Sequence, residues 1–213
     1  MQNQVQPAAP ELAAIEVETL DRSTLLVRGV LAAGALYGAT AVSPILRQAF
    51  AQGASQGDLD ILNFALTLEY LEAAFYDQGG KEVSDLSGEV KGYVETFGGE
   101  EQEHVEALMA TITDLGGKPV KAPAVDFGDA FSSADKFIET AITFEDLGVS
   151  AYNGAAPSIE SKDLLATAGG IVQVEARHAA TIRFAAGEDP APEAFDPTLS
   201  EDEVLKAVQP FLA

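Results

Sequence analysis

Residues 101–104 read EQEH and residues 175–178 read EARH, so each stretch places a histidine three residues after a glutamate. The chain contains no histidine besides these two. On an α-helix, residues three apart lie on one face, which brings each carboxylate beside its imidazole. Such pairs, projecting inward from two helices, hold metal ions in four-helix bundles. The two stretches therefore predict helices and a metal site.

An internal repeat surrounds the two stretches. In the first helix of each half, Leu62, Leu66, Glu69, Ala73 and Tyr76 match Ile138, Ile142, Glu145, Val149 and Tyr152 at identical offsets from the glutamate. In the second helix of each half, Val94, Phe97, Glu101, His104 and Leu108 match Ala168, Ile171, Glu175, His178 and Ile182. The repeat predicts one two-fold metal site with six ligands: Glu69, Glu101, His104, Glu145, Glu175 and His178.

The hydrophobic spacing predicts an all-α fold, because the valines and isoleucines follow helical rather than alternating spacing. The connections between helices are expected to be short, then long, then short. Two helical hairpins joined by one long crossover form the connectivity of a ferritin-like four-helix bundle. The predicted helices cover about 58–77, 87–115, 132–155 and 160–186, with a turn at 78–80 and a weak point at 98–99.

Three regions are expected along the chain. Residues 1–57 form an acidic arm and an apolar helix, and residues 58–186 form the four-helix bundle. Residues 187–213 form a proline-rich strap ending in a short helix, where Ser200 and Glu203 predict a capping box.

The uncharged segment 29–46 supports two interpretations. Arg22 and Arg28 precede it and a small-x-small tripeptide follows at 49–51, which favours an export signal or a membrane anchor, and hence an exported or cell-envelope protein. Acidic residues before the segment and Pro44 within it fit an export signal poorly. The alternative is a helix that packs on the bundle or on a second copy in a homo-oligomer, which predicts a cytoplasmic protein.

Composition limits the partners. The net charge of −22 repels phosphate backbones, so nucleic acid is excluded as an expected partner, whereas cations are attracted. The chain has no cysteine, so a metal must bind to oxygen and nitrogen atoms. Four carboxylates in a bundle core are costly to desolvate, and two divalent cations bring their charge near zero. This ligand set predicts two iron ions, with manganese as the alternative.

Several acids near the predicted ligands are assigned other roles. Glu72 lies close to Glu69, but its repeat counterpart is Gly148, so it is interpreted as a surface acid or a support for the ligands. Asp146 has no acidic counterpart and is expected to be exposed. A solvated stripe that guides cations inward is expected from Glu100, Glu103 and Glu106.

Tyr76 and Tyr152 lie two turns from Glu69 and Glu145 in the two halves. Packing in the core is the favoured role for both tyrosines. The alternative is a role in catalysis, in which each hydroxyl bonds a ligand carboxylate or donates an electron.

Five segments resemble a known family: LNFALTLEYLEAAFY (62–76), EEQEHVEAL (100–108), FEDLGVSAYNGAAP (144–157), VEARHAATIR (174–183) and GEDPAPEAFDPTLSEDEVLKAV (187–208). They look like the bacterial ferritin-like domain family that includes desiccation-related proteins, within the ferritin-like superfamily of dinuclear carboxylate proteins. The resemblance implies that Glu101 and Glu175 bridge two metals. It implies that His104 and His178 each bind one metal, and that Glu69 and Glu145 are terminal ligands.

The resemblance leaves three functions open. The first is a di-iron oxidoreductase of ferroxidase or peroxidase type, which oxidises Fe(II) or reduces O2 or peroxide. The second is a structural or stress-protection protein that a metal stabilises. The third is a manganese catalase. Full rubrerythrins carry a cysteine-rich module that this chain lacks, so electrons would come from elsewhere.

Overall fold

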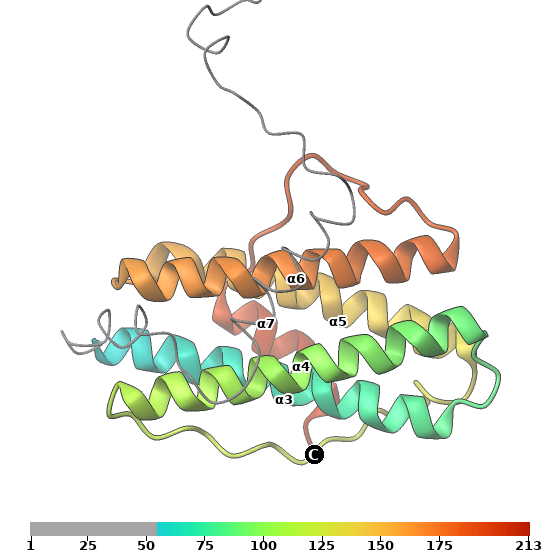
Figure 1. Ribbon diagram of the computed structural model, residues 1–213, viewed down its shortest axis with the longest axis horizontal. Coiled ribbons are helices and arrows are strands. Elements are labelled where there is room, and N and C mark those ends of the chain that lie inside the picture. Colours follow the sequence, from blue (N-terminus) through green and yellow to red (C-terminus); the bar gives the residue numbers. More distant parts are fainter. Residues whose placement is uncertain (1–54) are drawn as a thin grey trace, which may run out of the picture. The chain divides into compact units, whose positions relative to one another are not determined.

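The computed structural model describes residues 55–213 and shows a bundle of four long α-helices. They are α3 (Gln56–Glu82), α4 (Gly88–Asp114), α5 (Ala134–Ala155) and α6 (Lys162–Ala186). Helices α3 and α4 pack as one antiparallel hairpin and α5 and α6 as another (Figure 1). Within the described residues no strand forms, and the all-α bundle predicted from the spacing is confirmed.

Serine side chains begin all four bundle helices. Ser55, Ser87, Ser133 and Ser161 each adopt an extended backbone conformation, and each side chain accepts a hydrogen bond from a backbone N–H of the first turn. A serine at this position satisfies a donor that the helix leaves free, which stabilises a helix by about 1 kcal/mol. The helix starts are therefore set locally by the sequence.

Helix α3 does not end at the predicted turn. It continues through Gly79 and Gly80 to Glu82. Gly79 lies on the face of α3 that packs against α5, where it does not form a turn. A Cβ atom at Gly79 would lie 2.2 Å from the ring of Phe137, so the absent side chain lets α5 approach α3. Gly98 likewise faces Tyr76 without interrupting α4, and a Cβ atom there would lie 3.1 Å from Tyr76. Both glycines permit close packing and neither breaks a helix.

The C-terminal strap is fastened to the second hairpin. The backbone N–H of Leu199 donates to the carbonyl of Ser150, and Gly154 leaves room for the strap, since a Cβ atom there would overlap the Leu199 carbonyl. Helix α7 (Glu201–Val208) then begins at the predicted capping box of Ser200 and Glu203. A 3₁₀ turn, η4 (Gln209–Phe211), follows, and Leu212 pairs with the crossover in an isolated bridge.

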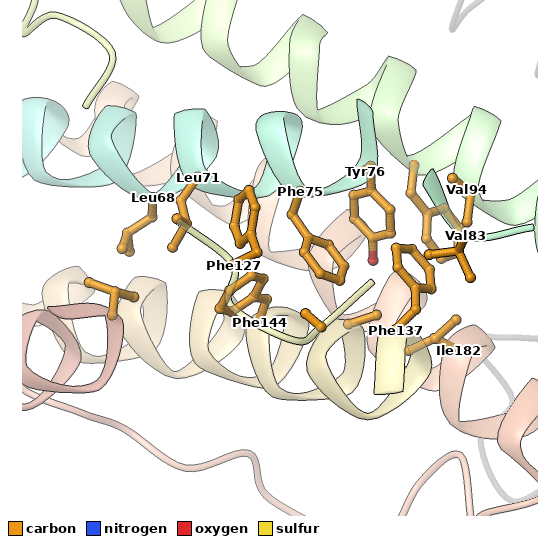
Figure 2. Close-up of a cluster of buried hydrophobic side chains, with 14 of the residues drawn as sticks. Leu68, Leu71, Phe75, Tyr76, Val83, Val94, Phe127, Phe137, Phe144 and Ile182 are labelled. Carbon is orange, nitrogen blue, oxygen red and sulfur yellow. The ribbon is translucent and has the colours of Figure 1, made fainter. Parts of the chain in front are cut away.

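An aromatic cluster fills one end of the bundle core (Figure 2). The ring of Phe75 stacks on that of Phe137, with centroids 4.7 Å apart, and meets Phe144 edge to face. Tyr76 lies beside these rings and contacts Phe97 from α4. The opposite end of the core is built from aliphatic side chains around Tyr152.

None of the described helices is long and apolar enough to cross a membrane. The apolar segment 29–46 lies outside the described residues, so both of its interpretations stay predictions.

Candidate metal centre

The six predicted ligands meet at the centre of the bundle. Each of the four helices contributes, and every one of the six side chains is buried. They form two overlapping groups whose ligand atoms lie within 4.8 Å of one another: Glu69, Glu101, His104 and Glu175, and then Glu101, Glu145, Glu175 and His178. Glu101 and Glu175 belong to both groups, so the geometry offers two adjacent metal positions with two shared carboxylates.

His104 joins three helices in the first group. Its Nδ1 atom lies 3.2 Å from Oε2 of Glu69, 3.0 Å from Oε2 of Glu101 and 3.2 Å from Oε1 of Glu175. One ring nitrogen cannot hydrogen-bond well to three carboxylates at once. A cation placed among these oxygens and the imidazole nitrogen would satisfy all four groups.

His178 has the equivalent place in the second group. Its Nδ1 atom lies 2.8 Å from Oε1 of Glu101 and 3.4 Å from Oε2 of Glu145. Its other nitrogen, Nε2, lies 2.6 Å from Oε2 of Glu100, whose side chain is 46% exposed. The solvated position predicted for Glu100 is therefore only partly correct, because its carboxylate also contacts the imidazole and can orient it, as such partners do at metal sites. The repeat places Val174 at the equivalent position.

Several donor atoms of this centre lack hydrogen-bond partners. They are Oε1 of Glu101, Oε2 of Glu145, both carboxylate oxygens of Glu175, and Nδ1 of His178, all of them buried. Although Nδ1 of His178 and Oε1 of Glu101 are close, their orientation makes no hydrogen bond. Unpaired buried polar atoms are costly, and here they point into one shared space. The donor set therefore fits a pair of metal ions.

Each tyrosine bonds a glutamate of the opposite hairpin. The hydroxyl of Tyr76 on α3 donates to Oε1 of Glu145 on α5, and the hydroxyl of Tyr152 on α5 donates to Oε1 of Glu69 on α3. The two bonds are related by the repeat. They leave Oε2 of each glutamate free to face a histidine, so the tyrosines orient the carboxylates.

The family model for the ferritin-like domain matches residues 57–188, which include all four long helices apart from Gln56, the first residue of α3. The chain belongs to the ferritin-like domain family. A similar solved structure is titled as one of the ferritin like, diiron-carboxylate proteins from Bacillus anthracis str. Ames. It shares 22% identity and a TM-score of 0.55, over 62% of this chain and 98% of that chain, and this likeness concerns the fold. A search of curated proteins finds no match.

Burial and neighbouring charges shift the pKa values of the ligand side chains in different directions. Burial raises the pKa of Glu69 and that of Glu145 to about 7. Burial alone would also raise the pKa of Glu101, but its hydrogen bond with His104 and the adjacent imidazole of His178 lower it to about 2. Burial alone would lower the pKa of His178, yet Glu101 and Glu145 raise it to about 11. In the absence of metal, the ferritin-like centre therefore retains protons at neutral pH.

Glu72 adds a fifth buried carboxyl group to the four ligand carboxylates of the centre. Its side chain is only 4% exposed, so the interpretation as a surface acid is wrong and the role of a support for the ligands fits. A Cβ atom at Gly148 would lie 3.1 Å from Oε1 of Glu72 and 3.0 Å from Oε2 of Glu175. The glycine thus leaves space for both carboxyl groups. Burial raises the pKa of Glu72, and the charge of Glu175 adds to the effect. Gly148 is the feature of the sequence that could have predicted a buried Glu72, because a glycine on the core face of α5 leaves space for a neighbouring side chain.

Asp146 pairs with a base rather than standing free in solvent. Its side chain is 40% exposed, and both of its carboxylate oxygens accept hydrogen bonds from the guanidinium of Arg183 on α6. The expected exposure is therefore only partly correct. The pair joins α5 to α6 at the surface and lies outside both metal groups.

Proposed function

We propose that the protein binds two metal ions, most favourably iron, and uses them to oxidise Fe(II) with O2 or peroxide. The observation that carries the proposal is the set of buried, unpaired donor atoms in two overlapping groups. A fold alone does not specify a function, but buried carboxylate and imidazole atoms that face one another are suited to binding metal ions. When bound, a pair of iron ions would supply two electrons, one from each Fe(II), and with two protons these reduce O2 to hydrogen peroxide.

The residues of the chain would hold the two ions in equivalent sets of donor groups. Glu101 and Glu175 lie between the two positions, and each histidine belongs to one of them. Tyr76 and Tyr152 keep the outer carboxylates in orientation through their hydroxyl protons. The buried core around the centre excludes water, which strengthens the interaction between carboxylate and cation.

Anaerobic titration tests the proposal. The metal-free full-length chain should bind two Fe(II) ions per chain, and the addition of O2 should produce ultraviolet ferric absorption. Glu101→Ala and His178→Ala should each slow this oxidation by at least about tenfold, since loss of a single supporting group already costs that much. Glu103→Gln is the matched control, because Glu103 lies in the same turn but is exposed. An equal rate in the ligand variants and the wild type would refute the proposal.

A second candidate is a structural or stress-protection protein in which metal stabilises the bundle without turnover. The same unpaired carboxylate oxygens favour it, because any divalent cation would remove their repulsion. This candidate predicts a large rise in melting temperature with Mn(II) or Fe(II), because only the folded chain binds. It also predicts no oxidation of Fe(II) above the buffer rate.

Elemental analysis of protein purified without added metal separates these candidates from a manganese catalase. Bound manganese together with rapid disproportionation of hydrogen peroxide would replace iron oxidation as the function. Bound iron without peroxide disproportionation would exclude the catalase.

A further inference from the structure

An apolar cavity lies at the Tyr152 end of the bundle. Its volume is about 40 Å³, and all four long helices line it. Space of roughly 10–15 Å³ suffices for one water-sized molecule, so this cavity has room for a small gas molecule. Its lining is almost wholly hydrocarbon, and apolar cavities of this kind stay free of water.

The cavity leads from the surface toward the metal centre. Ile61, Ala155 and Ala168 line it and are half-buried, whereas Leu108 and Tyr152 line it and are buried. Leu108 lies one helical turn from His104, and Tyr152 donates its hydroxyl proton to Glu69. None of the metal ligands lines the cavity, but Tyr152 lines it and connects it to Glu69 of the first group.

The equivalent space at the Tyr76 end is filled. Phe75 there corresponds to Ala151 at the cavity, and Val94 corresponds to Ala168. Two more positions differ in the same direction, since Phe137 corresponds to Ile61 and Phe97 to Ile171. The larger side chains pack around Tyr76 in Figure 2, where Phe75, Val94 and Phe137 are labelled. The bundle core thus has an apolar cavity at one end and is filled at the other, where a separate, more polar groove between α3 and α4 reaches Tyr76 and Val94 from the surface.

We infer that this cavity is the entry route of dioxygen, which reaches the Glu69 and His104 side of the centre before the Glu145 and His178 side. The inference rests on the proposed function and specifies its oxidant. Dioxygen is apolar and small, so it enters a dry hydrocarbon cavity without losing hydrogen bonds. Hydrogen peroxide would lose its hydrogen bonds to water there, which costs several kcal/mol.

Xenon binding to the metal-free full-length chain tests the cavity itself, since xenon is apolar and enters dry cavities. In crystals under xenon pressure, we expect xenon beside Leu62, Leu108 and Ile171. The double variant Ala151→Phe, Ala168→Val copies the residues of the closed end and should abolish the xenon site. Should the double variant fail to fold, Ala168→Val alone tests the same point, because Ala168 is half-buried and can accept two methyl groups. Absence of xenon from the wild-type cavity would overturn the inference.

Rapid mixing of the Fe(II)-loaded chain with O2 tests the route. The filled variant should show a second-order rate with O2 that is about tenfold lower, whereas its rate with hydrogen peroxide should change by less than about twofold. Leu108→Ala enlarges the cavity and should not slow the reaction with O2. Ala185→Val is the matched control for Ala168→Val, because it makes the same substitution in a surface groove at the Tyr76 end.

The results separate the inference from the proposed function. An unchanged O2 rate in a variant that has lost xenon overturns the entry route but leaves iron oxidation in place. Oxidation by peroxide alone in the wild type, with no reaction with O2, likewise overturns the route. A wild-type chain that oxidises no Fe(II) with either oxidant overturns the proposed function, whatever the xenon result.

Discussion

The Tyr76 end and the Tyr152 end of the bundle carry equivalent donor groups but different packing. Each end has a tyrosine that bonds a glutamate of the opposite hairpin. Around Tyr76 the core is aromatic and closed, and around Tyr152 it is aliphatic and contains a cavity. A charged centre requires a definite number of carboxylates and imidazoles, whereas a core requires only that apolar volume be filled. The donor groups therefore match in the two halves, and the packing residues differ.

On the surface, too, equivalent positions of the two hairpins carry different residues. Tyr70 donates to the sulfur of Met109 between α3 and α4, at a distance of 3.1 Å. The equivalent positions between α5 and α6 are Asp146 and Arg183, which form an ion pair. Equivalent positions therefore connect the two helices of each hairpin, but by a different interaction in each hairpin.

The largest difference between the ends is expected in core stability. Phe137→Ala should lower the free energy of unfolding of the metal-free chain by about 3–5 kcal/mol, because it removes a fully buried ring stacked on Phe75. The equivalent change Ile61→Ala should cost only about 1 kcal/mol, since Ile61 is half-buried beside existing space. Urea denaturation of both variants measures this. Equal losses would show that the ends are equally packed.

A pH titration should show that the outer carboxyl groups, one at each end, behave alike. The pKa of Glu69 and that of Glu145 are about 7 in the folded, metal-free chain, above the ordinary value of 4.5. A raised pKa stabilises the folded state below pH 4.5, and this contribution disappears as pH rises to 7. The raised pKa of His178 acts in the same direction up to pH 11.

The metal-free chain should therefore lose stability between pH 4.5 and 7, by on the order of 3 kcal/mol for each of the two carboxyl groups. Because metal binds the deprotonated groups, the metal-loaded chain should gain stability over the same range. Thermal unfolding with chelator and with Mn(II) measures both curves. A melting temperature of the chelated chain that rises over this range would contradict the assignment.

The tyrosine hydroxyls should contribute equally at the two ends. Tyr76→Phe and Tyr152→Phe should each weaken metal binding by about tenfold, because each leaves one ligand carboxylate without its partner. Calorimetric titration with Mn(II) gives both affinities. Tyr93→Phe is the control, since its hydroxyl bonds only the surface residue Glu89. A marked difference between the two core variants would contradict the expected equivalence of the two hydroxyls.

The smallest effect is expected from the surface pairs. Asp146→Asn should cost about 1 kcal/mol or less, and the loss should shrink at high salt, because this pair is partly exposed. Tyr70→Phe at the equivalent position should cost less and should not respond to salt. Urea denaturation at low and high salt distinguishes them, and a salt-dependent Tyr70→Phe would contradict the comparison.

The fold followed from local features of the sequence. Helical spacing and the order of short and long connections predicted the four-helix bundle, and the structure confirms it. The prediction was wrong where a residue acts through a distant partner. Gly79 was predicted to form a turn, but its missing side chain admits Phe137 from another helix.

The acids beside the centre show the same limit. Glu72 has no acidic counterpart in the repeat, which argued against a ligand role, and Glu100 was assigned to a solvated stripe. In the structure Glu72 occupies the space left by Gly148, and Glu100 reaches His178 across the helix interface. Spacing along one helix cannot show a contact made between two helices.

By itself, the sequence determined which residues share a helix face and which positions are equivalent in the two halves, because helical geometry is local and periodic. Only the tertiary structure decided which faces meet, and therefore that Tyr76 bonds Glu145 and that Tyr152 bonds Glu69. It also decided that one end of the bundle is filled and the other contains a cavity. Packing depends on the summed volume of side chains from several helices, and no single stretch of sequence contains that sum.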